Sequence, residues 1–211
     1  MAPLGTIGDF AGGAMLAVIG ILAALAERTR SGRGQVVDAA ILDGVLLTAS
    51  VDRFLRLRDA WGPRGTNVLD GGSHFYRSYR TADDRWVSFG AVEPRFHDEM
   101  LRCLGIDPAT VDQYDRGRWP ELAARIQAVL ATRTRDEWVA VFDDTEACVT
   151  PVLALGEVAD HPHLKARGTV VAPDGVPQAA PAPRFSRTPA ALPGPPAPPE
   201  DVESVLADWA R

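Results

Sequence analysis

Cysteine is scarce in this 211-residue sequence, which contains only Cys103 and Cys148. Two cysteines this far apart provide neither the paired spacing of a metal site nor the framework of a disulfide-stabilised secreted domain. We therefore predict no metal site. The scarcity of cysteine also favours a reducing compartment, and we expect the protein to be cytoplasmic.

Positive charge is also in short supply. The sequence has 22 lysines and arginines against 28 acidic residues, which gives a formal net charge of −6 at pH 7. A chain with this balance lacks the cationic field that draws nucleic acid or anionic lipid to a protein surface. We therefore expect neither nucleic acid nor a membrane among its partners.

The longest stretch without charge covers residues 10–26, which is marginal for crossing a bilayer, and Gly12, Gly13 and Gly20 interrupt it. A secretory signal needs positive charge before its apolar stretch, but the first basic residue here is Arg28, after that stretch. We therefore interpret residues 10–26 as part of a buried helix.

The composition is that of a globular protein, with 46% hydrophobic and 24% charged residues. Over residues 15–25 the apolar side chains leave no polar side, which predicts a helix that other segments cover almost completely. The glycines within residues 31–34 predict the end of this helix. A short strand over residues 35–39 and a second helix over residues 41–58 are predicted to follow.

A second unit is predicted to begin at residues 62–67, which are rich in turn formers. Residues 76–81 and 86–91 have the composition of strands and flank the polar residues 82–85, which predicts a β-hairpin. The other predicted elements are helices over residues 94–104, 119–132 and 134–144 and a strand over residues 149–155. This unit is therefore of the mixed α+β class.

Proline is concentrated over residues 162–199. Proline at this density excludes an interior helix or sheet and predicts an arm that runs extended over a surface. Residues 200–209 are predicted to form a short amphipathic helix, with Val202, Leu206 and Trp209 on its apolar side.

An acidic residue, Asp9, lies among glycines just before the long apolar helix, within residues 5–13. Glycines let a ligand approach the backbone closely, and a helix N-terminus would keep the Asp9 carboxylate ionised, as a base or nucleophile requires. The alternative is structural, with Asp9 as the N-cap of the helix and the glycines as packing sites. The residues by themselves leave both open.

A second acidic residue, Glu93, lies in the segment Gly-Ala-Val-Glu-Pro at residues 90–94, after a predicted strand and before a proline that can start a helix. Functional groups are often presented at such positions, although a capping or solvated acid is the alternative. Two carboxylates could divide acid and base roles if their environments moved their pKa values apart.

The remaining polar candidates fit structural roles better than chemical ones. Residues 160–163, Asp-His-Pro-His, resemble a fragment of a metal site but have no third ligand at a suitable spacing. His74 and His97 are isolated in the sequence, and we expect each to be a hydrogen-bonded structural residue. Cys148 lies in an apolar stretch and is expected to be a small core residue.

The segments Gly-Asp-Phe-Ala-Gly-Gly at residues 8–13 and Gly-Ala-Val-Glu-Pro-Arg-Phe at residues 90–96 are distinctive when taken together with others. The other matching segments are residues 27–40, 42–44, 161–163, 166–169 and 182–186. In this order, over nearly the whole chain, they resemble the family III CoA-transferases of the CaiB/BaiF type. Within that family they are similar to the α-methylacyl-CoA racemase branch.

The resemblance implies an α/β fold that corresponds to the C-terminal portion of the family's two-domain architecture. Residues 1–62 would form helices and a remnant strand of the large domain, with the catalytic aspartate. Residues 63–155 would form a small α+β domain, and residues 156–211 a proline-rich arm that returns to the large domain. Family members have a further N-terminal portion before the Gly-Asp motif, so we expect this chain to be incomplete on its own.

The resemblance also implies roles for individual residues. Asp9 matches the catalytic acid of the family's Gly-Asp motif. Glu93 matches the acid of the racemase-type Gly-Ala-Ile-Glu-Pro motif, which supports the proton-transfer pair. The residues expected to contact CoA are Gly12, Gly13 and Asp43. The resemblance implies no metal, flavin or nicotinamide cofactor, because the coenzyme A thioester is the substrate.

Three functions follow as expectations from this resemblance. In the first, the chain takes part in racemisation of a 2-methylacyl-CoA by moving its α-proton. In the second, Asp9 attacks the thioester and carries CoA between carboxylic acids as an aspartyl-CoA intermediate. In the third, the chain is a non-catalytic fragment or one half of a split enzyme. The expected partner is a second copy in an intertwined homodimer, or a chain that supplies the N-terminal part.

Overall fold

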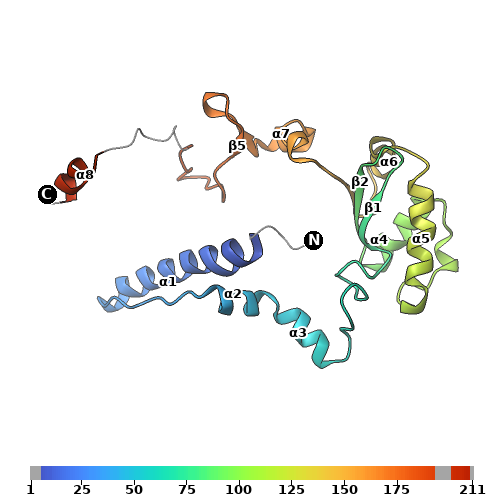
Figure 1. The fold of residues 1–211 in the computed structure, drawn as a ribbon, viewed down its shortest axis with the longest axis horizontal. Helices are drawn as coiled ribbons and strands as arrows, with labels where there is room; N and C mark the ends of the chain where they lie inside the picture. The colour runs from blue at the N-terminus through green and yellow to red at the C-terminus, as the bar shows by residue number, and fades with distance from the viewer. Residues whose placement is uncertain (1–5, 193–200, 210–211) are drawn as a thin grey trace.

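The computed structural model describes residues 6–192 and 201–209. An N-terminal group of helices, an α+β unit and a C-terminal segment follow one another along the chain, and the N-terminal helices lie apart from the α+β unit (Figure 1). The start of the C-terminal segment is joined to the α+β unit by an ion pair between Glu157 and Arg135 at 2.8 Å. The α/β class expected from the sequence is confirmed. The boundaries of 1–62, 63–155 and 156–211 for its parts stay a prediction.

The N-terminal helix begins as a π-helical segment, η1 (Thr6–Ala14), and continues as α1 (Met15–Ser31). It ends at Gly32, whose φ of +71° favours glycine and whose N–H donates to the Arg28 carbonyl at 2.9 Å. This end was predicted correctly.

The predicted burial of α1 is wrong for the described chain, because none of its residues is buried. Its exposed large apolar side chains are Met15, Val18, Ile19, Ile21, Leu22 and Leu25. The physical reason is that the nearest packed element, α2, crosses η1 and leaves most of α1 uncovered. By length and composition alone, the helical run of residues 6–31 is also apolar enough to cross a bilayer.

Two further corrections concern residues 33–58. Residues 33–40 form no strand, because within the described chain no other strand pairs with them. The helix predicted over residues 41–58 is two helices, α2 (Ile41–Thr48) and α3 (Ser50–Leu57), separated at Ala49.

The α+β unit contains an antiparallel sheet in the order β1-β2-β3. The predicted hairpin is confirmed as β1 (Tyr76–Arg80) and β2 (Trp86–Gly90), with Ser78 opposite Ser88. The predicted third strand is confirmed but shorter, as β3 (Val149–Val152) beside β2.

The helices of this unit were predicted within one or two residues of their ends: α4 (Pro94–Cys103), α5 (Trp119–Leu130) and α6 (Arg135–Phe142). Short 3-10 turns, η2 (Pro108–Thr110) and η3 (Arg116–Arg118), connect α4 to α5. A capping box between Thr134 and Glu137 starts α6.

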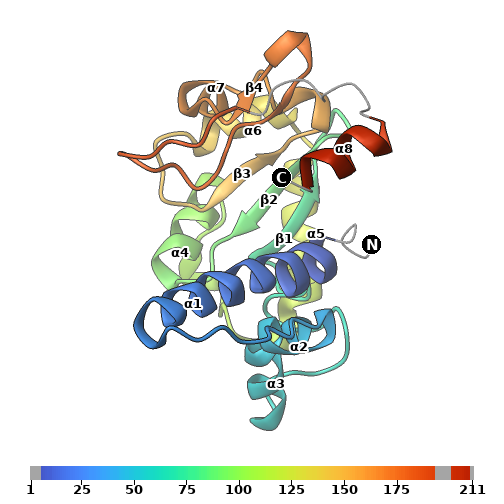
Figure 2. The same ribbon diagram turned by 90° about the vertical axis from the view of Figure 1, so that its left-hand side faces the viewer.

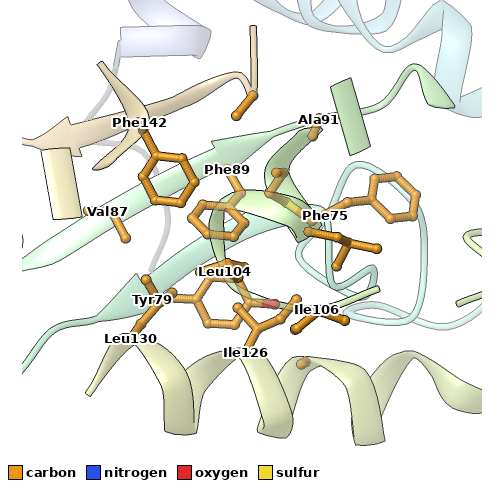
Figure 3. Close-up of a cluster of buried hydrophobic side chains, with 14 of the residues drawn as sticks. Phe75, Tyr79, Val87, Phe89, Ala91, Leu104, Ile106, Ile126, Leu130 and Phe142 are labelled. Carbon is orange, nitrogen blue, oxygen red and sulfur yellow. The ribbon is translucent and has the colours of Figure 1, made fainter. Parts of the chain in front are cut away.

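The hydrophobic core fills the space between one face of the sheet and these helices (Figure 3). The sheet and the residue before it contribute buried Phe75, Tyr79, Val87 and Phe89, and the helices contribute Met100, Leu101, Ile126, Leu130 and Phe142. We call this packed side of the sheet its inner face. The other side, the outer face, is turned toward the side of the molecule on which η1 and α1 lie (Figure 2).

The proline-rich segment contains more regular structure than predicted. After η4 (Leu155–Glu157) it forms α7 (Pro162–Arg167), η5 (Pro173–Gly175) and a two-stranded ladder of β4 (Val170–Val171) and β5 (Gln178–Ala179). A helix is possible here because Pro162 occupies the first helical position, where no N–H is needed. The C-terminal helix was predicted correctly and is α8 (Val202–Trp209).

Candidate functional site

Asp9 lies in the first turn of η1, where the positive end of the helix dipole favours a carboxylate. Its side chain is exposed and, in the described part of the chain, makes no hydrogen bond or ion pair. The N-cap alternative is wrong, because Asp9 lies inside the helical segment that contains Thr6. The carboxylate is therefore available to a ligand.

Gly12 and Gly13 are buried where η1 crosses α2. A Cβ on Gly13 would come within 2.9 Å of the Ile41 side chain, and one on Gly44 of α2 would overlap the Gly12 backbone. The glycines are thus needed for helix packing, which was the alternative that the sequence left open. Their role in binding CoA stays a prediction.

Asp43 is exposed in the first turn of α2, next to the crossing. It borders an open hollow of about 440 Å³ between α2 and α3, whose other walls are largely apolar and include Leu46, Phe54 and Leu57. Asp43 is therefore reachable by a ligand, and its contact with CoA also stays a prediction.

Glu93 stands between the end of β2 and the start of α4, as predicted. It occupies the N-cap position, but its side chain accepts no capping hydrogen bond, and Pro94 takes the first helical position. The carboxylate is exposed, and neither a hydrogen bond nor an ion pair is formed by it within the described residues. The capping alternative is therefore wrong.

Gln113 holds the loop that presents Glu93. The buried Gln113 amide donates from Nε2 to the carbonyls of Val92 at 2.8 Å and Ala91 at 3.3 Å. On the other side of the loop, the Ala91 N–H donates to the Phe75 carbonyl at 3.0 Å. Glu93 is thus fixed through the backbone of its neighbours.

Gln113 was missed in the sequence. It lies 20 residues beyond Glu93 along the chain, in a loop with no recognisable motif. No sequence signal connects this glutamine to the Gly-Ala-Val-Glu-Pro segment, so only the folded structure reveals the contact.

His74 and His97 are not isolated. Both are buried, and their Nε2 atoms lie 2.8 Å apart. His97 Nδ1 lies 3.7 Å from a carboxylate oxygen of Asp98, so we assign the His97 proton to Nδ1 and let His74 Nε2 donate to His97 Nε2. His97 also donates its backbone N–H to the Glu93 carbonyl at 3.0 Å. The expectation of structural, hydrogen-bonded histidines agrees with this arrangement.

Burial lowers the pKa of His74 to about 3, with a further contribution from His97. Burial also lowers the pKa of His97, although the Asp98 carboxylate opposes that shift. Both rings are neutral in the folded protein at neutral pH, because the nitrogen left to take a further proton, His74 Nδ1, is buried and has no hydrogen-bond partner within the described residues.

Cys148 is exposed, so the prediction of a core position is wrong. Its φ of +52° places the backbone in the left-handed region, and its carbonyl accepts from the Gly90 N–H at 2.9 Å. Partial desolvation raises the pKa of the thiol, and the carboxylates of Glu93 and Glu146 raise it further. Cys148 is therefore a weak nucleophile that lies on the same side of the sheet end as Glu93.

No group of three or more His, Cys, Asp or Glu side chains is placed to hold a metal ion in residues 6–192 and 201–209. Asp9 and Glu93 lie on different parts of the molecule, η1 and the β2–α4 loop (Figure 1). The structure therefore does not bring the two carboxylates together within the described chain. Each is unpaired there and chemically suited to proton transfer or nucleophilic attack, and Glu93 lies on a rigid loop.

The model of CoA-transferase family III matches residues 1–202. This chain belongs to that family. Among its curated relatives, the α-methylacyl-CoA racemase of Mus musculus is 43% identical over 195 residues, covering 89% of this chain and 50% of the racemase. The racemase of Homo sapiens is 42% identical, covering 81% of this chain and 45% of the racemase. The family and the racemase branch were both predicted correctly.

The family member described here spans about half the length of these curated relatives. A formyl-CoA:oxalate CoA-transferase of Bradyrhizobium diazoefficiens is 30% identical, covering 80% of this chain and 46% of the transferase. A solved CAIB/BAIF family protein of Brucella suis has a TM-score of 0.69 at 21% identity and covers 98% of this chain and 60% of its own. At this identity the structural likeness shows the fold alone.

Proposed function

We propose that this chain contributes the carboxylate part of an acyl-CoA racemase that acts on 2-methylacyl-CoA thioesters. The proposal rests on the sequence identity of this chain, which is 42–43% to two α-methylacyl-CoA racemases and 30% to the formyl-CoA:oxalate CoA-transferase. The free carboxylates of Asp9 and Glu93 support it, because proton transfer at carbon needs a base that is not engaged elsewhere.

In the proposed reaction, the thioester carbonyl makes the hydrogen on the adjacent carbon acidic. Asp9 accepts this proton, so the C–H electron pair moves into an enolate whose charge lies largely on the thioester oxygen. A second group returns a proton to the opposite face of the carbon, which inverts the centre. No cofactor takes part, since the thioester itself supplies the electron sink.

Glu93 is proposed to support this transfer. Its backbone position is fixed by Gln113 and by the start of α4, while its side chain stays free. A carboxylate on a rigid loop can keep a hydrogen-bonded partner in the correct protonation state without a change in its own position.

Deuterium incorporation tests the proposal. The purified chain is incubated in D2O with a single epimer of a 2-methylacyl-CoA, and mass spectrometry follows the label at the α-carbon. We expect slow exchange from the chain alone, and faster exchange when it is co-produced with the half of the racemase sequence that it does not span. Asp9→Asn should abolish both. Exchange that is unchanged in Asp9→Asn would contradict the role of Asp9.

A second candidate function is CoA transfer between carboxylic acids. It is favoured by the similarity to the formyl-CoA:oxalate CoA-transferase and by the exposed, unpaired Asp9 carboxylate, which could attack a thioester carbonyl. The attack would form a mixed anhydride and release CoA thiolate. The thiolate would then attack the aspartyl carbonyl of the anhydride, which breaks the anhydride C–O bond, releases the acyl group as its carboxylate and leaves an aspartyl-CoA thioester. Detection of CoA on the peptide that contains Asp9 supports the transferase, whereas α-deuteration without this adduct supports the racemase.

We further propose that the exposed apolar side of α1 is covered by another polypeptide, either a second copy or a chain that supplies the remaining part of the racemase architecture. The support is the set of large apolar side chains, such as Ile19 at 60% exposed and Leu22 at 60% exposed, along a helix that nothing described covers. Contiguous apolar surface of this kind marks an interaction site.

A further inference from the structure

The outer face of the β1-β2-β3 sheet carries a hollow of about 370 Å³. Neither Asp9 nor Glu93 lines it, and the proposed function gives it no role. Its walls come from all three strands and from the turn before β1. The residues that matter here are Leu69, Tyr76, Ser78, Ser88, Gly90 and Thr150. The outer face of the sheet, on which these residues lie, is turned toward the side of the molecule on which α1 lies (Figure 2).

Three hydroxyl groups form a row across the floor of this hollow. The register places Ser78 opposite Ser88 and Ser88 opposite Thr150, so their side chains share the outer face. None of the three hydroxyls makes a hydrogen bond in the part of the chain that the structure describes. A hydroxyl both donates and accepts, so the row can bind the oxygen of a ligand.

The other end of the hollow lies close to the proposed catalytic loop. Gly90 is two residues beyond Ser88 on the same face of β2, which is about 7 Å along a strand. The nearest atom to a Cβ built on Gly90 would be the Cys148 carbonyl oxygen at 3.9 Å. The glycine therefore leaves space that a ligand can enter, three residues before Glu93.

The positions of the nearby arginines indicate whether the ligand oxygen is charged. Arg80, the next cation along the outer face, is paired with Asp84 at 2.9 Å. Arg77 borders the hollow, but the register places its side chain on the inner face with Phe89. The hydroxyl row therefore suits an uncharged oxygen better than a carboxylate or a phosphate.

We propose that this hollow is the subsite for the acyl chain of the thioester, and that it selects chains with a hydroxyl or keto oxygen beyond the reacting carbon. The inference rests on the proposed function and adds the substrate class to it. The acyl carbon next to the thioester would lie toward Glu93, and the chain would run along β2 past Gly90 to the hydroxyls of Ser88 and its neighbours.

The two cysteines provide a test that does not need turnover. Cys148 borders the hollow and is exposed, whereas Cys103 lies at the end of α4 and is half-buried. Alkylation by iodoacetamide is followed by peptide mass spectrometry, with 6-hydroxyhexanoyl-CoA or hexanoyl-CoA as the protecting ligand. We expect both to slow alkylation of Cys148 but not of Cys103, the hydroxylated compound at a concentration about three- to ten-fold lower.

Variants of Gly90 and Ser88 test separately whether the ligand needs the empty space of the hollow and whether it needs the hydroxyl groups. A Cβ at Gly90 has ordinary van der Waals space, with the Cys148 carbonyl oxygen at 3.9 Å, so Gly90→Ala should weaken the protection of Cys148 by both compounds. Gly90→Val puts more volume into the hollow and should remove the protection. Ser88→Ala should remove only the advantage of the hydroxylated compound. Ser31→Ala, at a serine that bonds the Glu27 carbonyl within α1, is the matched control and should change neither result. Circular dichroism verifies that each variant is folded.

Each result has one meaning. If calorimetry shows that the acyl-CoAs bind but Cys148 is not protected, the subsite is overturned while the proposed function stands. If both compounds protect equally, the preference for an oxygen is overturned. If neither compound binds and no α-deuteration occurs, the proposed function fails, and the inference fails with it.

Discussion

Glu93 is held in place through its neighbours, since its own side chain is free. The Gln113 side-chain amide donates to two successive carbonyls of the loop, at Ala91 and Val92. The backbone carbonyl of Gln113 in turn accepts from Trp119 Nε1 at 2.8 Å, which fixes the glutamine itself. At the residue scale, the position of the proposed catalytic group is therefore set by a buried amide that takes no part in the chemistry. Gln113 is a positioning residue.

Replacing this amide should separate activity from stability. We expect Gln113→Leu to lower α-deuteration at least ten-fold and to destabilise the fold by about 1–3 kcal/mol, because the loop carbonyls lose their donor. Gln127→Leu is the matched control, since Gln127 also bonds backbone, at Arg80, but far along the chain from Glu93. The control should lose stability in urea unfolding while keeping its exchange rate. Equal loss of exchange in both variants would contradict a positioning role.

The buried histidine pair makes stability depend on pH. The pKa values of His74 and His97 are lowered by folding, so the unfolded chain binds more protons below its pKa of about 6.5. Stability is therefore complete above about pH 6.5 and falls as the pH drops below it. For His74 the loss continues toward pH 3, by up to about 1.4 kcal/mol per pH unit, and His97 adds to it in the same direction.

Urea unfolding between pH 7 and pH 5 measures this loss in a range where carboxylates remain ionised. His97→Phe should flatten the dependence because it removes one titrating ring from the pair. His163→Gln, on α7 at an exposed position, is the control and should leave the slope unchanged. A wild-type stability that is constant from pH 7 to pH 5 would show that the pair is not coupled to folding.

At the scale of elements, the crossing of η1 over α2 depends on three glycines. Gly12 and Gly13 of η1 and Gly44 of α2 let the two backbones approach so closely that a methyl group has no space. This contact fixes the orientation of the segment that carries Asp9. The two helices are thus held together by close backbone packing at the glycines, and their large apolar side chains remain mostly exposed.

Gly44→Ala should open this crossing. A Cβ at this position overlaps the Gly12 backbone, and overpacking of this type costs about 1–3 kcal/mol. Gly34→Ala is the matched control, since a Cβ there meets no atom within 4 Å. Hydrogen–deuterium exchange over residues 6–14 and 41–48 should accelerate in Gly44→Ala and stay unchanged in Gly34→Ala. Unchanged protection in both would contradict the packing role.

At the scale of the whole molecule, the chain divides into a well-packed part and an open part. The α+β unit has a closed core, whereas helices α1, α2 and α3 present large apolar side chains to solvent, such as Leu42 and Leu57. Within the described chain, the apolar side chains of these three helices are therefore not buried by other segments. The part that carries Asp9 needs a partner more than the part that carries Glu93 does.

This difference predicts self-association through the N-terminal helices. Light scattering at micromolar concentration should show the chain as a dimer or a larger species, since contiguous exposed apolar surface favours association. The double variant Ile19→Glu with Leu22→Glu should shift it toward a monomer, and Phe185→Glu, at an exposed position of the C-terminal segment, should not. A monomeric wild-type chain would contradict the prediction.

The sequence by itself determined the elements whose signals are local. The hairpin of β1 and β2, the helices α4, α5 and α6, and the end of α1 at Gly32 follow from residue alternation, helix periodicity and a left-handed glycine. The order of the Gly-Asp and Gly-Ala-Val-Glu-Pro segments likewise predicted the family, because such motifs persist as contiguous residues.

Only the tertiary structure decided which distant residues meet. It joined His74 to His97, placed Gln113 under the Glu93 loop and brought Cys148 to the surface beside Gly90. It also decided that residues 33–40 pair with no strand and that α1 stays uncovered in the described chain. These outcomes depend on contacts between segments far apart in sequence, which neither periodicity nor spacing along the chain encodes.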